Sequence, residues 1–191
     1  MRLDLVPATA MLLSSELESI DGFGTLLGAD VPEGWPPGQY DRGAITFFRD
    51  RVNEDPNAAG WYSWYALLRA DEKRGRTLVG AGGYFGPPNP NGILEIGYSI
   101  VPSYEGQGYA TELVRALVEH GFADSRVRRI IAHTTKDNPG SVRVLEHAGF
   151  TCMGSSQDLC LLENSVDRPA AQPSAAPDAG HPTVAEDRFS F

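Results

Sequence analysis

The spacing of apolar residues in the first third of the chain predicts a strand, two helices and an irregular segment. Leu3 and Leu5 indicate a first strand, and residues 8–19 carry leucines at helical spacing between strong helix formers. Residues 28–42, GADVPEGWPPGQYDR, hold too many prolines for regular structure, so we interpret them as a loop and a candidate lid on the substrate side. An apolar stripe with helical period follows, made of Ala44, Phe47, Phe48 and Val52.

Strand-like runs dominate the middle of the chain. They cover residues 61–70, 77–86 and 93–101 and are separated by charged or Gly/Pro/Asn turns, which predicts an antiparallel meander. Strands and helices then follow in an irregular order, so we predict a mixed α/β sheet and not a doubly wound parallel one. These later elements are a helix at about 108–122, a strand at 129–135, a helix at 138–147 and short strands at 151–154 and 159–163.

The composition changes near the end of the chain. From about Asn164 to Phe191, prolines stand among alanines, serines and acids, and the apolar residues have no period. Such a segment cannot bury enough apolar surface to offset the entropy lost on ordering. We therefore predict one folded domain over residues 1–163 and a disordered Pro/Ala-rich tail over residues 164–191.

Charge and hydropathy exclude several classes of protein. The 191 residues include 16 Lys and Arg against 25 Asp and Glu, a net charge of −9, which repels nucleic acids and anionic membranes. No stretch approaches the roughly 18 apolar residues of a membrane span, and the first residues do not resemble a signal peptide. We therefore expect a cytoplasmic protein that binds neither nucleic acid nor membrane.

The cysteines and aromatic residues support weaker predictions. Cys152 and Cys160 have no histidines at zinc-finger spacing, so we expect buried free thiols and no metal site. Trp35 and Tyr40, in the Pro-rich loop, are candidates to touch a substrate. We expect core positions for Trp61, Trp64 and Tyr65, and structural or surface roles for His120, His133 and His147.

A Gly-rich turn between the strand at 93–101 and the helix at 108–122 is the segment best suited to chemistry. Gly106 and Gly108 allow close approach of a ligand to the backbone, and the first amides of the helix lack intrahelical partners. A pyrophosphate can accept these amides, and each such hydrogen bond contributes about 1.5 to 3 kcal/mol. The turn is neither a Walker A motif nor a Rossmann fingerprint, so alone it leaves a phosphate site and an ordinary turn equally open.

Three motifs resemble those of the GCN5-related N-acetyltransferases, especially the branch typified by ribosomal-protein alanine acetyltransferases. EGQGYATEL (105–113) is similar to the acetyl-CoA loop of that family, and IGYSIVP (96–102) to the strand before it. DNPGSVRVLEHAGF (137–150) is similar to the family's Asn-x-x-Ser helix, which ends in Gly-Phe. The resemblance implies a mixed, mostly antiparallel sheet flanked by helices and splayed between its fourth and fifth strands, with acetyl-CoA as co-substrate in the gap.

The same resemblance implies which residues contact acetyl-CoA. The strand backbone at Tyr98, Ser99 and Ile100 would face the acetyl and pantetheine groups, and Asn138 and Ser141 would face them from the later helix. In one departure from the family, a glutamate at position 105 replaces the usual Gln or Arg, but the phosphates need only backbone amides there. The pyrophosphate would be held by Gly106, Gln107, Gly108, Tyr109, Ala110 and Thr111.

Glu95 and Ser141 are the candidate catalytic residues. Strand alternation places Glu95 on one face with Gly97 and Ser99, where small neighbours leave room for a ligand, so it is a candidate base. The alternative is a solvated strand carboxylate. Leu145 stands where many relatives have a tyrosine acid, so the resemblance implies that Ser141 assists the departing thiolate. Its alternative role is to satisfy backbone amides in the first helical turn.

The sequence therefore predicts an acetyl-CoA-dependent N-acetyltransferase that moves an acetyl group directly to a primary amine of a peptide N-terminus or small molecule. One alternative is a non-catalytic acyl-CoA-binding or sensor module of the same fold, which Glu105 and Leu145 favour. A phosphate-binding module of another kind is a third. The acceptor and the oligomeric state stay open, a homodimer being the commonest arrangement.

Overall fold

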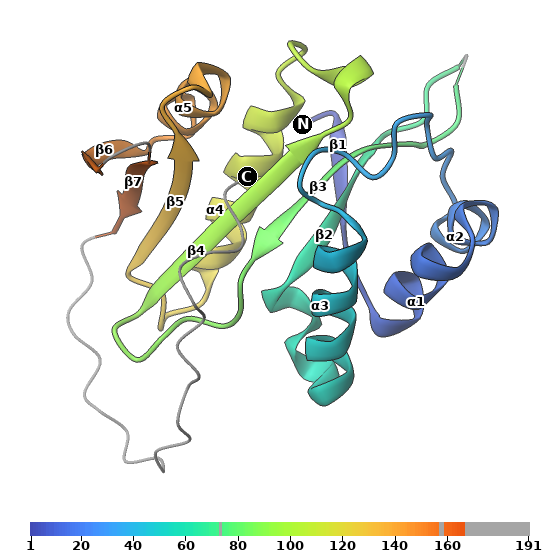
Figure 1. Cartoon of the computed structure of the whole chain (residues 1–191), viewed down its shortest axis with the longest axis horizontal. Coiled ribbons are helices and arrows are strands. Elements are labelled where there is room, and N and C mark those ends of the chain that lie inside the picture. The colour runs from blue at the N-terminus through green and yellow to red at the C-terminus, as the bar shows by residue number, and fades with distance from the viewer. Residues whose placement is uncertain (73, 157–158, 167–191) are drawn as a thin grey trace.

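The computed structural model describes residues 1–72, 74–156 and 159–166. They form a seven-stranded sheet with the order β1-β2-β3-β4-β5-β7-β6 (Figure 1). β4 and β5 are parallel, and the other neighbouring pairs are antiparallel, which confirms the mixed, mostly antiparallel sheet that the sequence predicts. The strands are β1 (Leu3–Pro7), β2 (Ser63–Leu68), β3 (Thr77–Tyr84), β4 (Ile93–Ile100), β5 (Arg129–Thr135), β6 (Thr151–Ser156) and β7 (Leu159–Ser165).

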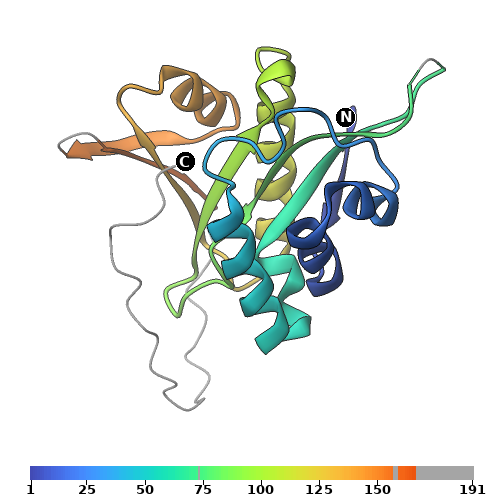
Figure 2. The same ribbon diagram turned by 45° about the vertical axis from the view of Figure 1, so that its right-hand side comes forward.

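Helices cover both faces of this sheet (Figures 1 and 2). Helices α1, α2 and α3 pack on one face, against Tyr65 and Leu67 of β2, whereas α4 and α5 belong to the opposite face, with Ala66 and Leu68. Successive residues of β2 thus enter two separate cores, as strand alternation requires. The helices are α1 (Ala10–Glu18), α2 (Ile20–Leu27), α3 (Arg42–Glu54), α4 (Tyr109–Ala123) and α5 (Pro139–His147), with short 3₁₀ helices η1 (Pro56–Trp61) and η2 (Pro102–Tyr104).

β3 is buried along its whole length and is rich in glycine, which lets its neighbours approach closely. A Cβ atom at Gly83 would lie 1.9 Å from the carbonyl oxygen of Tyr62. A Cβ atom at Gly80 would lie 2.6 Å from the carbonyl oxygen of Ser99 on β4. Both contacts are too short for real atoms, so only glycine at these positions lets the chain on either side come this close.

The predicted elements are present with boundaries shifted by a few residues, but the sequence analysis missed α2. This helix follows α1 after the single residue Ser19, whose hydroxyl accepts a hydrogen bond from the N–H of Gly22. Two glycines in its sequence, IDGFGTLL, lower its helix propensity and hide it. Packing accounts for Gly24, because a Cβ atom there would lie 3.1 Å from the carbonyl oxygen of Ala29.

The β6–β7 hairpin corrects the expectation of buried thiols. Cys152 is exposed and Cys160 is half-buried, although both are free as predicted. Cys152 lies on β6, the edge strand, and this position explains its exposure. β7 extends to Ser165, two residues into the range 164–191 that composition assigns to the tail, and residues 167–191 lie outside the described residues. None of the described helices has both the length and the apolar character to cross a bilayer.

A buried carboxyl group, that of Glu16 on α1, joins three aromatic residues from distant parts of the chain. It accepts hydrogen bonds from the Trp35 indole N–H at 2.7 Å, the Tyr40 hydroxyl at 3.2 Å and the Tyr65 hydroxyl at 2.6 Å. The Pro-rich segment, residues 28–41, is thereby tied to α1 and β2. The prediction that Tyr40 touches a substrate was wrong, because its side chain is buried in the core under this segment; the Trp35 indole is half-buried against the same core.

We predict that Glu16 makes the stability of the fold depend on pH. Burial raises its pKa from 4.5 to about 7, against the three hydrogen bonds, which act to lower it. The folded state therefore binds more protons, and the stability that this group contributes is fully present below pH 4.5 and is lost as the pH rises through 7. Relative to a Glu16→Gln variant, the wild type should lose up to about 3 kcal/mol of unfolding free energy across this range.

Urea unfolding of both proteins at a series of pH values measures this loss. Glu18→Gln, an exposed substitution on the same helix, controls for a general effect of removing an acid. A difference between wild type and Glu16→Gln that stays constant with pH would contradict the prediction.

Candidate active site

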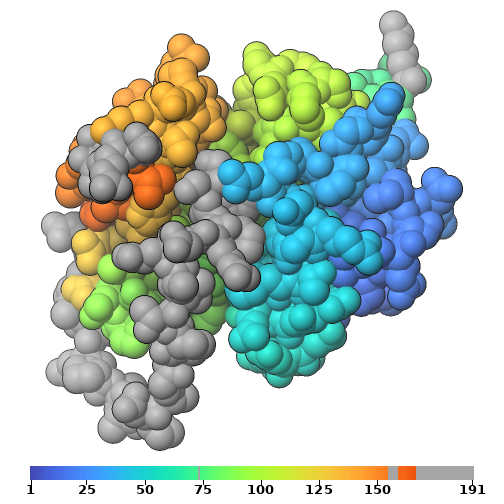
Figure 3. All heavy atoms as spheres, viewed as in Figure 1, coloured from blue at the N-terminus to red at the C-terminus, as the bar shows by residue number. Residues whose placement is uncertain are grey.

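β4 and β5 pair over a short stretch and then part. Their register runs from Ile93 opposite Arg129 to Ile96 opposite Ala132, whereas β4 continues to residue 100 and β5 to residue 135. Figure 1 shows the strands diverging beyond this point, and Figure 3 shows a notch between the α5 region in orange and the yellow-green segment after β4. The splay predicted between the fourth and fifth strands is therefore present.

The facing edges of the parted strands carry backbone groups without ladder partners, and a buried hydroxyl lies beside them. Thr134, in the parted section of β5, is fully buried, and its Oγ1 has no hydrogen-bond partner within the part of the chain that the structure describes. An unsatisfied buried polar group costs about 1 to 3 kcal/mol.

The turn after β4 opens the start of α4 to an anion. Gly106 and Gly108 both have positive φ angles, of 70° and 84°, and Gly108 is the N-cap of α4 without a side-chain cap. A Cβ atom at Gly106 would meet nothing within 4 Å, so the turn is open. The first N–H groups of this 15-residue helix face outward at its positive end, which suits a phosphate. The predicted residues Tyr109, Ala110 and Thr111 form its first turn.

Arg2, close to the N-terminus, contacts this turn, a role that was not predicted from the sequence. Its guanidinium donates to the Gln107 carbonyl oxygen at 2.8 Å and to the Glu112 carboxylate, and lies 4.3 Å from the centre of the Tyr109 ring. Burial acts to raise the pKa of Glu112, but the hydrogen bonds and charge of Arg2 outweigh it and lower that pKa. A cation is thus held beside the turn, although Glu105 is acidic.

Glu95 lies at the base of the gap and contacts His133 of β5. The distance between Glu95 Oε1 and His133 Nδ1 is 2.8 Å, and both side chains are a little over one third exposed. An ionised carboxylate only accepts hydrogen bonds, so Nδ1 carries the hydrogen in that state. A structural or surface role was expected for His133, because its side-chain contact with Glu95 joins residues far apart in the sequence and was not visible there. His120 and His147 lie on α4 and α5.

Ser141 is held at two points near the start of α5. Its backbone N–H donates to the Oδ1 of Asn138, the N-cap residue, at 3.0 Å. Its hydroxyl lies 2.8 Å from the hydroxyl of Tyr98, which reaches across from the parted section of β4. Asn138 therefore satisfies the backbone amide, and the Ser141 hydroxyl stays available for another role. Leu145, which replaces the tyrosine of many relatives, is apolar and fully buried, so this position has no side-chain proton donor.

The Pro-rich segment approaches the opposite face of β4. A Cβ atom at Gly38 would lie 2.5 Å from the hydroxyl of Ser99, and one at Gly34 would lie 3.8 Å from Val101. Ser99 and Glu95 share this face of the strand. The Pro-rich segment therefore packs on β4 at Ser99, on the face of the strand that Glu95 shares.

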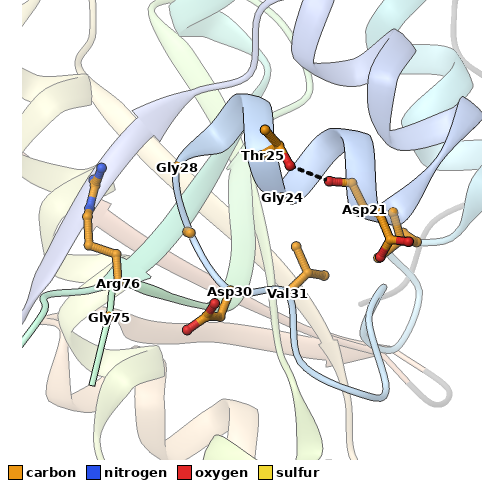
Figure 4. Close-up of a pocket in the computed structure, with 10 residues that line it drawn as sticks. Asp21, Gly24, Thr25, Gly28, Asp30, Val31, Gly75 and Arg76 are labelled. Atoms are coloured by element: carbon orange, nitrogen blue, oxygen red, sulfur yellow. Dashed lines mark hydrogen bonds between the residues drawn. The ribbon is translucent and has the colours of Figure 1, made fainter. Parts of the chain in front are cut away.

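A separate hollow of about 490 Å³ lies away from the gap, between the end of α2 and residues 75–76 (Figure 4). Asp30 crosses its floor and is fixed by backbone hydrogen bonds to Arg76 and Leu78. Asp21 and Thr25 line its α2 side. None of the predicted site residues lines this hollow.

Comparison with known proteins gives a consistent result. The acetyltransferase (GNAT) domain matches residues 21–151. An uncharacterized N-acetyltransferase of Bacillus subtilis, YjdG, is 32% identical over 124 residues, covering 65% of this chain and 71% of that protein. The ribosomal-protein-serine acetyltransferase of Escherichia coli is 27% identical over 108 residues, covering 56% and 58%. The chain spans about half or less of the length of several other curated relatives.

The fold is also similar to that of solved acetyltransferases. The aminoglycoside acetyltransferase AAC(6')-Ib, solved with coenzyme A and kanamycin, superposes with a TM-score of 0.54 at 20% identity, covering 85% of this chain and 94% of that one. At this identity the likeness concerns the fold alone.

We predict that the Asn138 cap stabilises α5 and with it the position of Ser141. Asn138→Ala should lower the free energy of unfolding by about 1 kcal/mol, whereas Asn138→Asp should retain most of it. Urea unfolding measures both, with Asp137→Ala at the exposed neighbouring position as the control. Wild-type stability in Asn138→Ala would show that the cap does not hold the helix.

Proposed function

This chain belongs to the acetyltransferase (GNAT) family, and on that premise we propose that it transfers the acetyl group of acetyl-CoA directly to a primary amine. The acceptor is the N-terminus of a peptide or an amine of a small molecule. The observation that carries the proposal is the junction of an uncapped helix start with two parted strands, since β4 leads through η2 and the Gly-rich turn into α4. That junction offers backbone donors to a diphosphate and a gap for an extended thioester.

The residues of the junction fit acetyl-CoA, which supplies an activated acetyl group as a thioester. The amides of residues 106–111 would hold the diphosphate, and Arg2 adds a positive charge beside them. The backbone of residues 98–100 would face the pantetheine arm and the thioester.

Glu95 and His133 would act on the amine side. The acceptor nitrogen forms a bond to the acetyl carbon as the carbon–sulfur bond breaks, and the sulfur keeps the electron pair. The proton released by the nitrogen moves to the carboxylate of Glu95. The contact with His133 holds that carboxylate in place. The remaining contribution is orientation of the two substrates by rigid strands.

The pKa of the amine bears on the class of acceptor. An amine attacks the thioester only after it has lost its proton, and the cost of this loss rises with its pKa. An α-amine with a pKa of about 8 loses its proton at pH 7.4 at a cost of about 1 kcal/mol, whereas a lysine-like amine costs about 4 kcal/mol. Proteins similar to this chain include a ribosomal-protein-serine acetyltransferase and an aminoglycoside acetyltransferase, so an acceptor screen needs both classes.

We predict that acetyl-CoA stabilises the protein selectively. At about 100 times its Kd a specific ligand adds about 2.7 kcal/mol, which corresponds to a rise in Tm of roughly 5 to 10 °C for a chain of this size. Thermal-shift titrations with acetyl-CoA, ATP and NAD measure this. An equal response to all three ligands would favour a general phosphate site, and binding without turnover of any amine would favour the sensor module.

We predict that Glu95→Gln lowers kcat/KM about 100-fold at neutral pH, because the amine loses its proton acceptor. His133→Ala should lower it less, and His133→Asn, which keeps a donor near the Nδ1 position, should retain more activity than His133→Ala. Steady-state rates between about pH 6 and 9 measure these effects, with the exposed substitution Glu146→Gln as control. Full activity of Glu95→Gln across that range would exclude the carboxylate as the base.

A further inference from the structure

The phenol of Tyr98 spans the gap between the parted strands. Tyr98 lies two residues beyond the last paired position of β4, and its ring packs on the α4–α5 face. Its hydroxyl contacts Ser141 twice, at 2.8 Å from Oγ and 3.2 Å from the carbonyl oxygen. The contact joins β4 to α5 where no backbone hydrogen bond joins β4 to β5.

Two hydrogen-bond arrangements fit these distances. In one, Tyr98 donates to the carbonyl oxygen of Ser141 and accepts from its hydroxyl, so that both protons are used within the pair. In the other, Tyr98 donates to Oγ, and the Ser141 proton is free to point into the gap. A negative charge in the gap favours the second arrangement, because a charge-assisted hydrogen bond is stronger than a neutral one.

We propose that Tyr98 is the positioning residue for the Ser141 hydroxyl and directs its proton at the sulfur that leaves during transfer. This inference rests on the proposed function. As the carbon–sulfur bond breaks, the sulfur gains the electron pair and the Ser141 O–H donates a hydrogen bond to it. The Ser141 proton stays on its oxygen, and the proton lost by the amine goes to Glu95, so the transfer is balanced.

The surroundings of Tyr98 keep it in the donor state. Burial raises its pKa to about 12, against the hydrogen bond with Ser141, which acts to lower it, so the phenol is protonated at neutral pH. The Tyr98–Ser141 pair thereby supplies a phenol near the sulfur, although Leu145 occupies the position where many relatives have a tyrosine. A phenol on β4 and a hydroxyl on α5 act together, and neither position suffices alone.

Binding of CoA and of desulfo-CoA, in which hydrogen replaces the thiol, tests the proposal without turnover. Titration calorimetry at about pH 9, where much of the CoA thiol is ionised, should show that the wild type prefers CoA. Tyr98→Phe and Ser141→Ala should each lose about 10-fold of this preference, and the double variant should lose little more than either alone. Tyr62→Phe, which removes a phenol from the end of η1, should keep the wild-type preference.

Turnover gives a second readout. Tyr98→Phe should lower kcat about 10-fold and leave the KM for acetyl-CoA within about 2-fold of the wild-type value. Full CoA preference in Tyr98→Phe, or equal weakening of CoA and desulfo-CoA, would overturn the proposal. If the wild type binds CoA but acetylates no amine, the proposed function fails while the binding preference still decides the role of Tyr98. If the wild type binds neither ligand, both proposals fail.

Discussion

The structure of the site depends on the parting of β4 and β5. A sheet interior normally satisfies both edges of each strand, but here the register ends after Ile96 and Ala132. The cost is limited because each strand keeps its outer partner, β3 for β4 and β7 for β5. One edge of each strand is thus released over a few residues only. In the same region the hydroxyl of Thr134 is buried and has no hydrogen-bond partner among the described residues.

The two cores on either side of the sheet stabilise the strands that carry the open edge. The glycines of β3 let β4 lie close to it, and α4 covers β3 and β4 from one face. On the other face the carboxyl group of Glu16 accepts hydrogen bonds from Trp35, Tyr40 and Tyr65. These bonds hold the Pro-rich segment beside Ser99. The walls of the gap are therefore held in place for separate reasons, and the side-chain contacts described across the gap are those of Tyr98 with Ser141 and of Glu95 with His133.

The sequence predicted those features that short-range patterns encode. Period-2 and period-3.6 spacing located the strands and most helices, and the Gly-rich turn and the Asn-x-x-Ser helix were recognised from local motifs. α2 was missed because its glycines, which packing requires at Gly24, weaken the local helical signal. The errors at Tyr40 and Cys152, and the omission of His133 and Arg2, share another cause. Their surroundings are set by residues distant in sequence, such as Glu16 for Tyr40 and Glu95 for His133. A single sequence does not show which distant residues come into contact.

Side-chain alternation along β4 also places the candidate base and the Tyr98 phenol on opposite faces of the strand. Glu95 and Ser99 share the face of the strand that the Pro-rich segment contacts at Ser99, whereas Tyr98 faces α4 and α5. Under the proposed function, Glu95 would accept the proton of the amine, and Tyr98 and Ser141 would act on the sulfur. A single strand thus keeps the group that accepts a proton apart from the groups that donate hydrogen bonds. Because the two groups lie on opposite faces, Glu95 hydrogen-bonds to His133 and Tyr98 hydrogen-bonds to Ser141.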